Sequence, residues 1–377
     1  MISGNAAKDS PRSSAAPRRN IIVVGGSAGA LDALRAMLAG LPRTLDASVL
    51  VVMHLPPSSP GRLAEILQRG CALEVGWATN DEPVTPGRVY VAPPDQHLVV
   101  RGDRVLLTHA PRENNSRPAI DPLFRSAALA YGPRVIGVIV SGRLDDGTAG
   151  LWAVKERGGV AVVQDPADAT NPDMPRNALR YTVADHIVRA AELGPLLARL
   201  VEEPAPPATG PPPRELDLEV KIAMQANALE AGVMTLGPPA PYTCPECHGV
   251  LARIEQEGVP RFRCHTGHAF SLDSLLASIT EKAEEALWRA LRAVEETTLL
   301  LDEVARTGPN GAAPVDGAGV APADPRFLEK AREARGRATL IREAVLRHQV
   351  LSLDSIRASR ASISAATPAP PSPSSLE

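Results

Sequence analysis

The sequence predicts an α/β fold with a doubly wound, mostly parallel sheet and an edge hairpin, followed by a small module and a C-terminal α-helical hairpin. Short runs rich in valine and isoleucine alternate with helical patterns between residues 20 and 203. Runs without polar alternation are typical of strands that are covered on both faces. Three cysteines crowd between residues 244 and 264, and apolar residues recur twice at helical spacing after residue 271.

The bulk properties of the chain exclude several classes of protein. With 377 residues the chain exceeds what one ordinary core holds, so we expect more than one folded part. A formal net charge of −3 gives no basic surface for a nucleic-acid backbone, and no nucleic-acid partner is expected. The first twenty residues lack the apolar stretch of a signal peptide, and no later stretch approaches a membrane span. We therefore expect a cytoplasmic protein without membrane insertion.

The strand and helix patterns of the first half follow one another in order. The apolar run IIVVG at 21–25 precedes a helical pattern at 31–41 and the run ASVLVVMHL at 47–55. The runs VIGVIVSG at 135–142 and GVAVVQD at 159–165 have the same buried character. Residues 88–112 contain three runs separated by turn residues, which predicts one or two hairpins at an edge of the sheet.

The composition changes after residue 203 to PAPPATGPPPRE, a proline-rich spacer that cannot carry a packed core. A short amphipathic helix is expected around Leu216–Ala231. The predicted organisation is a disordered tail at 1–19, the α/β domain at 20–203, a linker with a short helix at 204–240, the cysteine module at 241–270, a helical hairpin at 271–352 and a disordered tail at 353–377.

Ser27 lies in a glycine-rich turn between the first predicted strand and the helix that follows it. Small neighbours let the backbone turn sharply, and N–H groups at the start of a helix can stabilise a developing oxyanion. A dinucleotide site is disfavoured, because the fingerprint G-x-G-x-x-G is not met and the second strand ends in His54 instead of an acidic residue.

Two hydrolase layouts compete for Ser27. Residues 25–29 fit the G-x-S-x-G nucleophile elbow, with Asp146 and His186 following in the order of α/β-hydrolases. Alternatively, Ser27, His54 and Asp146 follow three different strands, whose carboxyl ends form the ligand crevice of a parallel sheet. A serine needs a neighbouring base, and the base needs a carboxylate to orient it. Each residue alone also fits a helix cap or a structural hydrogen bond, so the pattern alone leaves these alternatives open.

Several motifs in order resemble the catalytic domain of the chemotaxis protein-glutamate methylesterase family. The similarity covers roughly residues 20–200 and rests on IIVVGGSAGALDAL, VVMHLPP, PGRVYVAPPDQHLVV, RPAIDPLFRSAA and VIVSGRLDDGTAGL. The resemblance implies a serine esterase that hydrolyses γ-glutamyl methyl esters on chemoreceptors and releases methanol, without a catalytic cofactor. Deamidation of receptor glutamines is a second implied reaction.

The resemblance also implies the roles of individual residues. The nucleophile falls on Ser27, the general base on His54 and the orienting carboxylate on Asp146, while the neighbouring Asp145 is expected to cap a helix or stay solvated. The backbone N–H groups near Ala28, Gly29 and Ala30 are expected to hold the oxyanion. His97, His109 and His186 are expected in hydrogen bonds or at the surface.

The chain departs from the family pattern at four points. Ala28 stands where a hydroxylated residue is often found, Ala30 where a second glycine is expected, and Arg143 where a methionine is expected near the aspartate. These changes bear on substrate binding. The nineteen residues before the first strand cannot hold the receiver domain of the chemotaxis enzymes, so we expect control by a separate response regulator or by the C-terminal part.

The cysteines have the spacing of metal ligands. Cys244 and Cys247 form one pair, and Cys264 with His268 forms a second pair sixteen residues later, which matches a zinc-ribbon-like module. A closed Cys₃His set makes zinc structural instead of catalytic. His265 and His248 are alternatives for the fourth ligand. The paired helices that follow are expected to pack against each other or to contact a helical signalling partner, so a binding protein that keeps an inert hydrolase fold is the alternative function.

Overall fold

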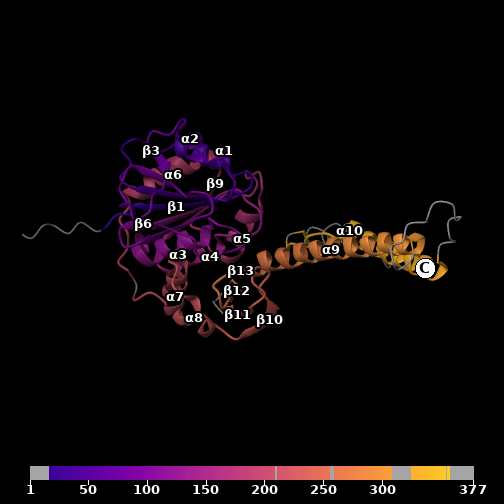
Figure 1. Cartoon of the computed structure of the whole chain (residues 1–377). Coiled ribbons are helices and arrows are strands. Elements are labelled where there is room, and N and C mark those ends of the chain that lie inside the picture. The colour runs from indigo at the N-terminus through magenta and orange to yellow at the C-terminus, as the bar shows by residue number, and fades with distance from the viewer. Residues whose placement is uncertain (1–16, 209, 255–258, 308–323, 354, 357–377) are drawn as a thin grey trace, which may run out of the picture. The chain divides into compact units, whose positions relative to one another are not determined.

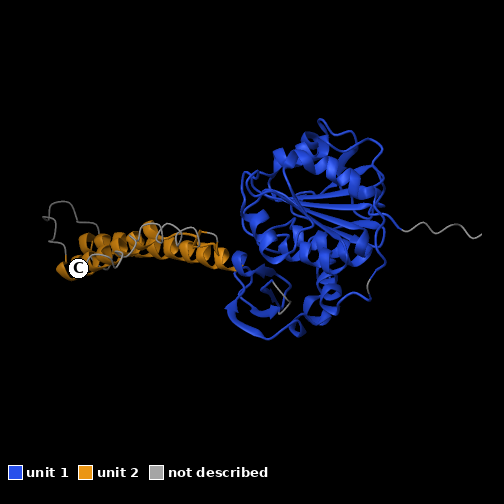
Figure 2. Cartoon of the chain, turned by 180° about the vertical axis from the view of Figure 1, so that it is seen from behind, with its two compact units in different colours: residues 1–274 blue, residues 275–377 orange. Residues whose placement is uncertain are grey.

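The computed structural model describes residues 17–208, 210–254, 259–307, 324–353, 355 and 356. The two predicted tails and the glycine- and proline-rich stretch between the last two helices lie largely outside these residues. Residues 1–274 form one compact unit and residues 275–377 form a second (Figure 2). The two units are described separately below.

The centre of the first unit is a sheet of seven parallel strands. Its strand order is β3-β4-β2-β1-β7-β8-β9, and the crossovers between neighbours confirm the predicted doubly wound fold. The strands are β1 (Ile21–Gly26), β2 (Ser48–Met53), β3 (Glu74–Trp77), β4 (Arg88–Val91), β7 (Val135–Ile139), β8 (Val160–Gln164) and β9 (His186–Val188). All six residues of β1 are buried, as expected for a strand covered on both faces.

Helices cover both faces of this sheet (Figure 1). On one face α1 (Ala30–Ala39), α2 (Leu63–Gln68) and α6 (Ala190–Glu202) share a core with Ile22 and Val24 of β1. On the other face α3 (Ile120–Tyr131), α4 (Thr148–Glu156) and α5 (Asp173–Tyr181) share a core with Ile21 and Val23. Alternate residues of one strand therefore feed two separate cores, which explains why the strand sequences are apolar throughout.

The predicted edge hairpin forms over a shorter range than expected. β5 (His97–Arg101) and β6 (Arg104–Thr108) pair antiparallel as a separate two-stranded sheet. The expectation that residues 88–91 join such a hairpin is wrong, because β4 pairs parallel with both β2 and β3. Val89, Tyr90 and Val91 are buried, and this continuous burial suits a strand inside a parallel sheet.

The proline-rich stretch after residue 203 is followed by α7 (Arg214–Ala223), a short α8 (Ala228–Ala231) and the single turn η2 (Val233–Thr235). A further single turn, η1 (Gly132–Arg134), lies between α3 and β7. Leu216 and Val220 of α7 belong to the same core as α3. The single helix predicted around Leu216–Ala231 thus forms as two helices, α7 and α8, and α7 packs against the α/β core.

A small antiparallel sheet completes the first unit. It consists of β10 (Pro239–Thr243), β11 (Val250–Ile254), β12 (Arg261–Cys264) and β13 (Ala269–Ser271), in that order. We call residues 239–271 the small sheet. Its last strand meets the loop before α3, because the N–H of Asn114 donates to the carbonyl of Ala269 across 2.8 Å.

The second unit consists of two antiparallel helices, as the sequence predicts. They are α9 (Leu272–Thr307), whose first turn still belongs to the first unit, and α10 (Pro325–Arg347). Ion pairs join Arg335 to Asp302 and Arg342 to Glu295. Across the part of the chain that the structure describes, none of the helices combines the length and the apolar character needed to cross a membrane.

Candidate active site

Ser27 lies directly after β1, in the tight turn that leads into α1. The left-handed conformation of Gly29 (φ 74°) ends this turn, and a Cβ atom there would lie 2.6 Å from Cβ of Thr170, so only glycine fits. The N–H of Ser27 donates to the carbonyl of Ser141 across 3.0 Å. The backbone of Ser27 is therefore fixed against the segment that follows β7.

The oxyanion donors expected around Ser27 are only partly available. The N–H of Ala30 donates to the carbonyl of Ser27 across 3.1 Å, so it is engaged within the turn. The N–H groups of Ala28 and Gly29 have no acceptor among the described residues, and both residues are exposed. These two N–H groups are therefore the ones that can donate hydrogen bonds to an anion beside Ser27.

His54 follows β2 and lies beside Ser27. Gly26 and Met53 are register partners in adjacent strands, so the two residues that follow them leave the sheet side by side. The N–H of His54 donates to the carbonyl of Gly26 across 3.2 Å. The Nε2 atom of His54 lies 2.7 Å from Oδ2 of Asp146, which joins the imidazole to the carboxylate.

Asp146 is buried and surrounded by donors. Its carboxylate accepts hydrogen bonds from the N–H of Ile120 (2.7 Å), Nδ2 of Asn114 (2.8 Å) and the N–H of Gly147 (3.0 Å). Burial opposes ionisation, but the hydrogen bond and charge of His54 and these N–H donors hold the pKa of Asp146 below its usual range. The residue therefore stays an anion beside the imidazole.

Asp121, in the first turn of α3, is a second buried carboxyl group close to Asp146, and Nδ2 of Asn114 donates to both. Burial and the negative charge of Asp146 raise the pKa of Asp121 to about 7, despite Arg125 nearby. When two carboxyl groups share a buried site, one of them keeps its proton. Of these two carboxyl groups, Asp121 therefore takes up a proton first as the pH falls, and Asp146 keeps its charge.

Asp145 corrects one sequence-based expectation. Instead of capping a helix or staying solvated, its side chain is buried and accepts a hydrogen bond from Oγ of Ser271 across 2.5 Å. Burial raises the pKa of Asp145 to about 8, and Asp273, Asp121 and Asp146 add to this effect. Ser271 of the small sheet covers Asp145, although it lies 126 residues further along the chain.

Among the described residues, the remaining histidines of the α/β part form no hydrogen bond with Asp146. His97 is buried and bonds the carbonyl of Pro111 (3.1 Å) and the N–H of Ala119 (3.1 Å) through its two ring nitrogens. His109 is exposed. His186 begins β9 at the far edge of the sheet, three strands from β1. The structure thus brings His54 to Asp146, and it gives His186 no place in the nucleophile-elbow layout.

The loop before α3 contributes residues that the sequence analysis did not single out. Glu113 and Ser116 pair across a turn whose two central residues, Asn114 and Asn115, have φ of 49° and 64°. Two successive positive φ angles define a type I′ turn, in which asparagine is favoured. The turn presents Oγ of Ser116 to Nδ1 of His54 at 3.3 Å.

This turn lines a pocket of about 280 Å³ beside His54. The pocket is bounded by residues 55–57 on one side and by Arg112, Asn115, Ser116 and Arg117 on the other. Two arginines at its rim give it a positive character. Arg143, which was expected to bear on substrate binding, is exposed and is not one of the residues that line this pocket.

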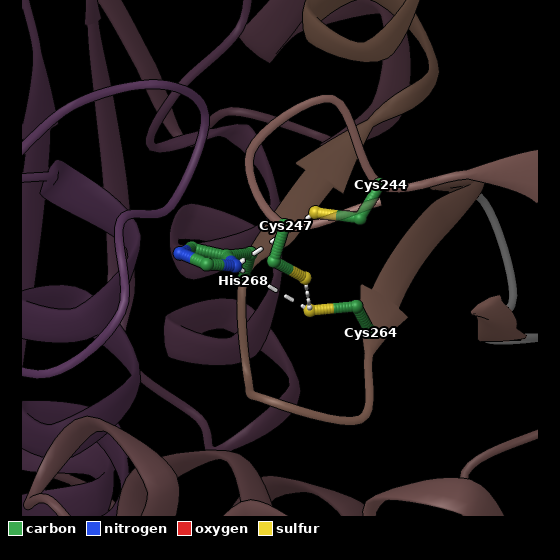
Figure 3. Close-up of side chains that lie close together, drawn as sticks. All are labelled: Cys244, Cys247, Cys264 and His268. Carbon is green, nitrogen blue, oxygen red and sulfur yellow. Dashed lines mark hydrogen bonds between the residues drawn. The ribbon is translucent and has the colours of Figure 1, made fainter. Parts of the chain in front are cut away.

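The predicted metal ligands meet in the small sheet (Figure 3). The ligand atoms of Cys244, Cys247, Cys264 and His268 all lie within 4.8 Å of one another. The sulfurs of Cys247 and Cys264 are 3.7 Å apart, and Nδ1 of His268 lies 3.5 Å from the sulfur of Cys264. A tetrahedron with Zn–S bonds of about 2.3 Å has edges of about 3.7 Å, so this set fits zinc.

The two alternative ligands do not join the cluster. His248 and His265 are both exposed, and the imidazole of His268 occupies the fourth corner. Turns hold the two ligand pairs, because the N–H of His248 donates to the carbonyl of Cys244 and the N–H of Gly267 donates to that of Cys264. Gly267 has φ of 105°, which a residue with a side chain rarely adopts.

Comparisons with known proteins place the α/β part in one family. Residues 22–197 match the family model described as CheB methylesterase. A relative from Leptospira interrogans (strain Fiocruz L1-130) is 38% identical over 180 residues, which are 48% of this chain and 93% of that protein. A protein-glutamate methylesterase/protein-glutamine glutaminase from Nocardioides sp. (strain ATCC BAA-499 / JS614) is 39% identical over 188 residues, 48% of this chain and 51% of that protein.

A solved structure is also similar. The crystal structure of the Thermotoga maritima CheB methylesterase catalytic domain has 34% sequence identity and a TM-score of 0.47, covering 48% of this chain and 98% of that chain. The small sheet and the two C-terminal helices lie beyond the region that the family model matches. Because the chain is 38% identical to the Leptospira relative along 93% of that protein and matches the family model over residues 22–197, it belongs to the CheB methylesterase family.

Proposed function

We propose that this chain hydrolyses γ-glutamyl methyl esters of chemoreceptors, with Ser27 as nucleophile, His54 as general base and Asp146 as the orienting carboxylate. The observation that carries the proposal is the 2.7 Å contact between Nε2 of His54 and the buried, ionised Asp146. His54 itself follows Met53, the strand partner of Gly26, and so lies beside Ser27. The names of the relatives support the substrate class, and glutamine deamidation is the second reaction that those names carry.

The tautomer of His54 follows from its partners. An ionised Asp146 accepts a hydrogen bond from Nε2–H, so Nε2 carries the hydrogen and Nδ1 keeps its lone pair. Nδ1 then takes the hydroxyl proton of Ser27 as its oxygen attacks the ester carbonyl. The tetrahedral intermediate collapses, Nδ1–H returns the proton to the departing methoxide, and methanol leaves. Water, deprotonated by the same nitrogen, then releases the glutamate and regenerates Ser27.

The N–H groups of Ala28 and Gly29 are the donors for the oxyanion in this mechanism. They lie at the start of α1, where the helix dipole favours negative charge. Ala30 was expected as a third donor, but its N–H is bound to Ser27. We assign the oxyanion to the first two positions.

The pocket beside His54 suits an acidic protein surface. Arg112 and Arg117 line it, although Arg117 also pairs with Asp95 at 2.8 Å. A receptor segment that carries glutamates next to the esterified one would be attracted to these cations. Substrate contact by Arg143 and control by a separate response regulator stay predictions.

We further propose that Cys244, Cys247, Cys264 and His268 bind one structural zinc ion. Four protein ligands close the coordination sphere, so the metal would hold the small sheet together and would take no part in ester hydrolysis. We expect the bound metal to add folding energy to the small sheet.

The experiment that tests the esterase proposal is methanol release from a methylated chemoreceptor. We expect the wild type to release methanol and Ser27→Ala to fall to the uncatalysed rate. Ser116→Ala is the matched comparison, because Oγ of Ser116 also approaches Nδ1 of His54. We expect it to change turnover by less than about tenfold, since an alcohol that only bonds the base contributes little to the barrier.

Two outcomes would contradict the proposal. Activity that survives in Ser27→Ala but disappears in Ser116→Ala would move the nucleophile to the loop before α3. A well-folded wild type that releases no methanol and instead binds a signalling protein would favour the alternative of an inert scaffold with a hydrolase fold.

A further inference from the structure

We infer that the small sheet is a working part of the active site, because it positions the carboxylate of Asp146 through Asn114. The inference rests on the proposed function and adds a positioning residue to it. Asn114 is buried and belongs to the loop before α3, while its partners come from both the α/β part and the small sheet. All of these residues lie within the first compact unit.

The side-chain amide of Asn114 has all of its hydrogen-bonding groups engaged. Its Nδ2 donates to Oδ1 of Asp146 (2.8 Å) and to Oδ2 of Asp121 (3.1 Å). Its Oδ1 accepts from the N–H of Ser271 (2.9 Å) and from Oγ of Ser274 (2.9 Å). An amide has two donors and two acceptor sites, and this site satisfies each of them.

The small sheet decides which way this amide faces. A backbone N–H can only donate, so the atom of Asn114 that meets the N–H of Ser271 must be the oxygen. The NH₂ group is thereby directed at the two carboxyl groups. Without Ser271 and Ser274 the oxygen would lose both of its donors, and the amide would no longer be held in the orientation that serves Asp146.

The backbone of the same loop is paired with the small sheet. The N–H of Asn114 donates to the carbonyl of Ala269 (2.8 Å), and the N–H of Ala269 donates to the carbonyl of Arg112 (3.3 Å). These bonds hold the type I′ turn that also presents Ser116 to His54. The position of the pocket loop and the orientation of Asn114 therefore depend on the same strand, β13.

Buried charges join the metal-ligand turn to this loop. Arg263 of β12 donates to the carbonyl of Gly267 (2.8 Å), inside the turn between Cys264 and His268. The same guanidinium bonds Glu113 at 2.9 Å, the residue next to Asn114. Glu113 and Arg263 are both buried. Separating such a buried ion pair destabilises the folded protein, because it leaves a buried charge without its partner. A folded ligand turn thus fixes the residue beside Asn114.

The test replaces Asn114 with glycine in the full-length protein. Glycine adopts the left-handed φ of 49° without strain, so Asn114→Gly removes the amide and keeps the backbone bonds. Ser274→Ala is a second, milder variant that removes one donor to Asn114. Gln225→Gly is the matched control, because Gln225 is exposed and also left-handed (φ 67°).

Two measurements are made on each variant. Steady-state hydrolysis of a methylated receptor gives kcat and KM, and proton NMR gives the low-field signal of the hydrogen between Nε2 of His54 and Asp146, assigned by its loss in His54→Ala. We expect Asn114→Gly to lower kcat about 10- to 100-fold with KM nearly unchanged and to shift or broaden the NMR signal. Ser274→Ala should change both in the same direction by less, and Gln225→Gly should match the wild type.

The inference is overturned if Asn114→Gly keeps the wild-type kcat, or if kcat falls while the His54 signal stays in place. Circular dichroism checks folding, and Ser274→Ala decides the matter if Asn114→Gly does not fold. A wild type that hydrolyses no ester would end the proposed function instead. In that case the NMR signal alone shows whether Asn114 positions Asp146.

Discussion

His54 meets Asp146 through Nε2, with 2.7 Å between Nε2 and Oδ2, so Nδ1 is the ring nitrogen that remains for a substrate-side hydroxyl. In serine proteases the carboxylate bonds Nδ1 and the base is Nε2, whereas here the carboxylate of Asp146 meets Nε2. The two residues reach this site from opposite sides of β1. His54 follows β2 and lies beside Ser27, whereas Asp146 lies in the loop after β7.

Replacing His54 should abolish turnover, whereas replacing His186 should not. We expect His54→Ala to lower kcat by on the order of a thousandfold or more, because the base and its carboxylate are both disabled. His186 lies on the edge strand β9, so His186→Ala should keep wild-type kinetics. Methanol release from methylated receptor measures both. A strong loss in His186→Ala alone would restore the nucleophile-elbow layout.

Asp145 should make the stability of the protein depend on pH. Burial raises its pKa to about 8 from an ordinary value of 3.8, so between these pH values the folded state holds a proton that the unfolded state releases. Stability therefore falls as the pH rises from about 4 to about 8. Asp145→Asn is neutral throughout, and it should match the wild type near pH 4 and exceed its stability near pH 8. Urea unfolding at several pH values tests this. A constant difference across the range would contradict the buried, protonated state.

Removing a metal ligand should unfold the small sheet. We expect about one zinc ion per chain in the wild type, and none in Cys244→Ser, which should also unfold at lower temperature. Cys71→Ser is the control, because Cys71 is a free thiol outside the cluster. Elemental analysis together with thermal unfolding makes the comparison. A wild type that contains no metal and unfolds at the same temperature as Cys244→Ser would rule out the structural ion.

The buried charges around Glu113 should matter far more than a surface pair. Glu113 pairs with Arg125 and Arg263, all three being buried. Glu113→Gln should lower the free energy of unfolding by about 3–5 kcal/mol, because two buried guanidinium groups each lose one counter-charge and keep the more distant or shared charge of Glu219. Glu203→Gln breaks the exposed pair with Arg19 and should cost less than about 1 kcal/mol. Equal effects in chemical denaturation would argue against the network.

The sequence predicts the parts of the fold that local pattern determines. Strands such as 21–26 are buried on both faces, so valine and isoleucine accumulate without alternation. The four candidate metal ligands are likewise set by short spacings within two turns. The pairing of β4 could not be read in this way, because its partners β2 and β3 precede it and nothing in a four-residue run specifies parallel or antiparallel contact.

In the candidate site, too, the residues that follow a local pattern were predicted, and those that depend on distant contacts were not. Ser27, His54 and Asp146 each follow a recognisable strand, and the family resemblance chose among the alternatives. Ser116 and Asn114 were missed, because their partners lie 62 and 32 residues away in sequence. The Asn-Asn pair at 114–115 was an available sign of a type I′ turn, but it does not predict what the turn faces. The burial of Asp145 depends on Ser271, 126 residues later.

The turn at Glu113–Ser116 has a practical consequence for protein engineering. One side of it contacts the small sheet and the other lines the pocket, so the two cannot be exchanged independently between relatives. A chimera that grafts residues 239–274 onto a shorter family member would have to transplant residues 112–117 with them. Conversely, trimming this chain to its family-matching region would remove the hydrogen bonds that Ser271 and Ser274 make to Asn114 and Asp145.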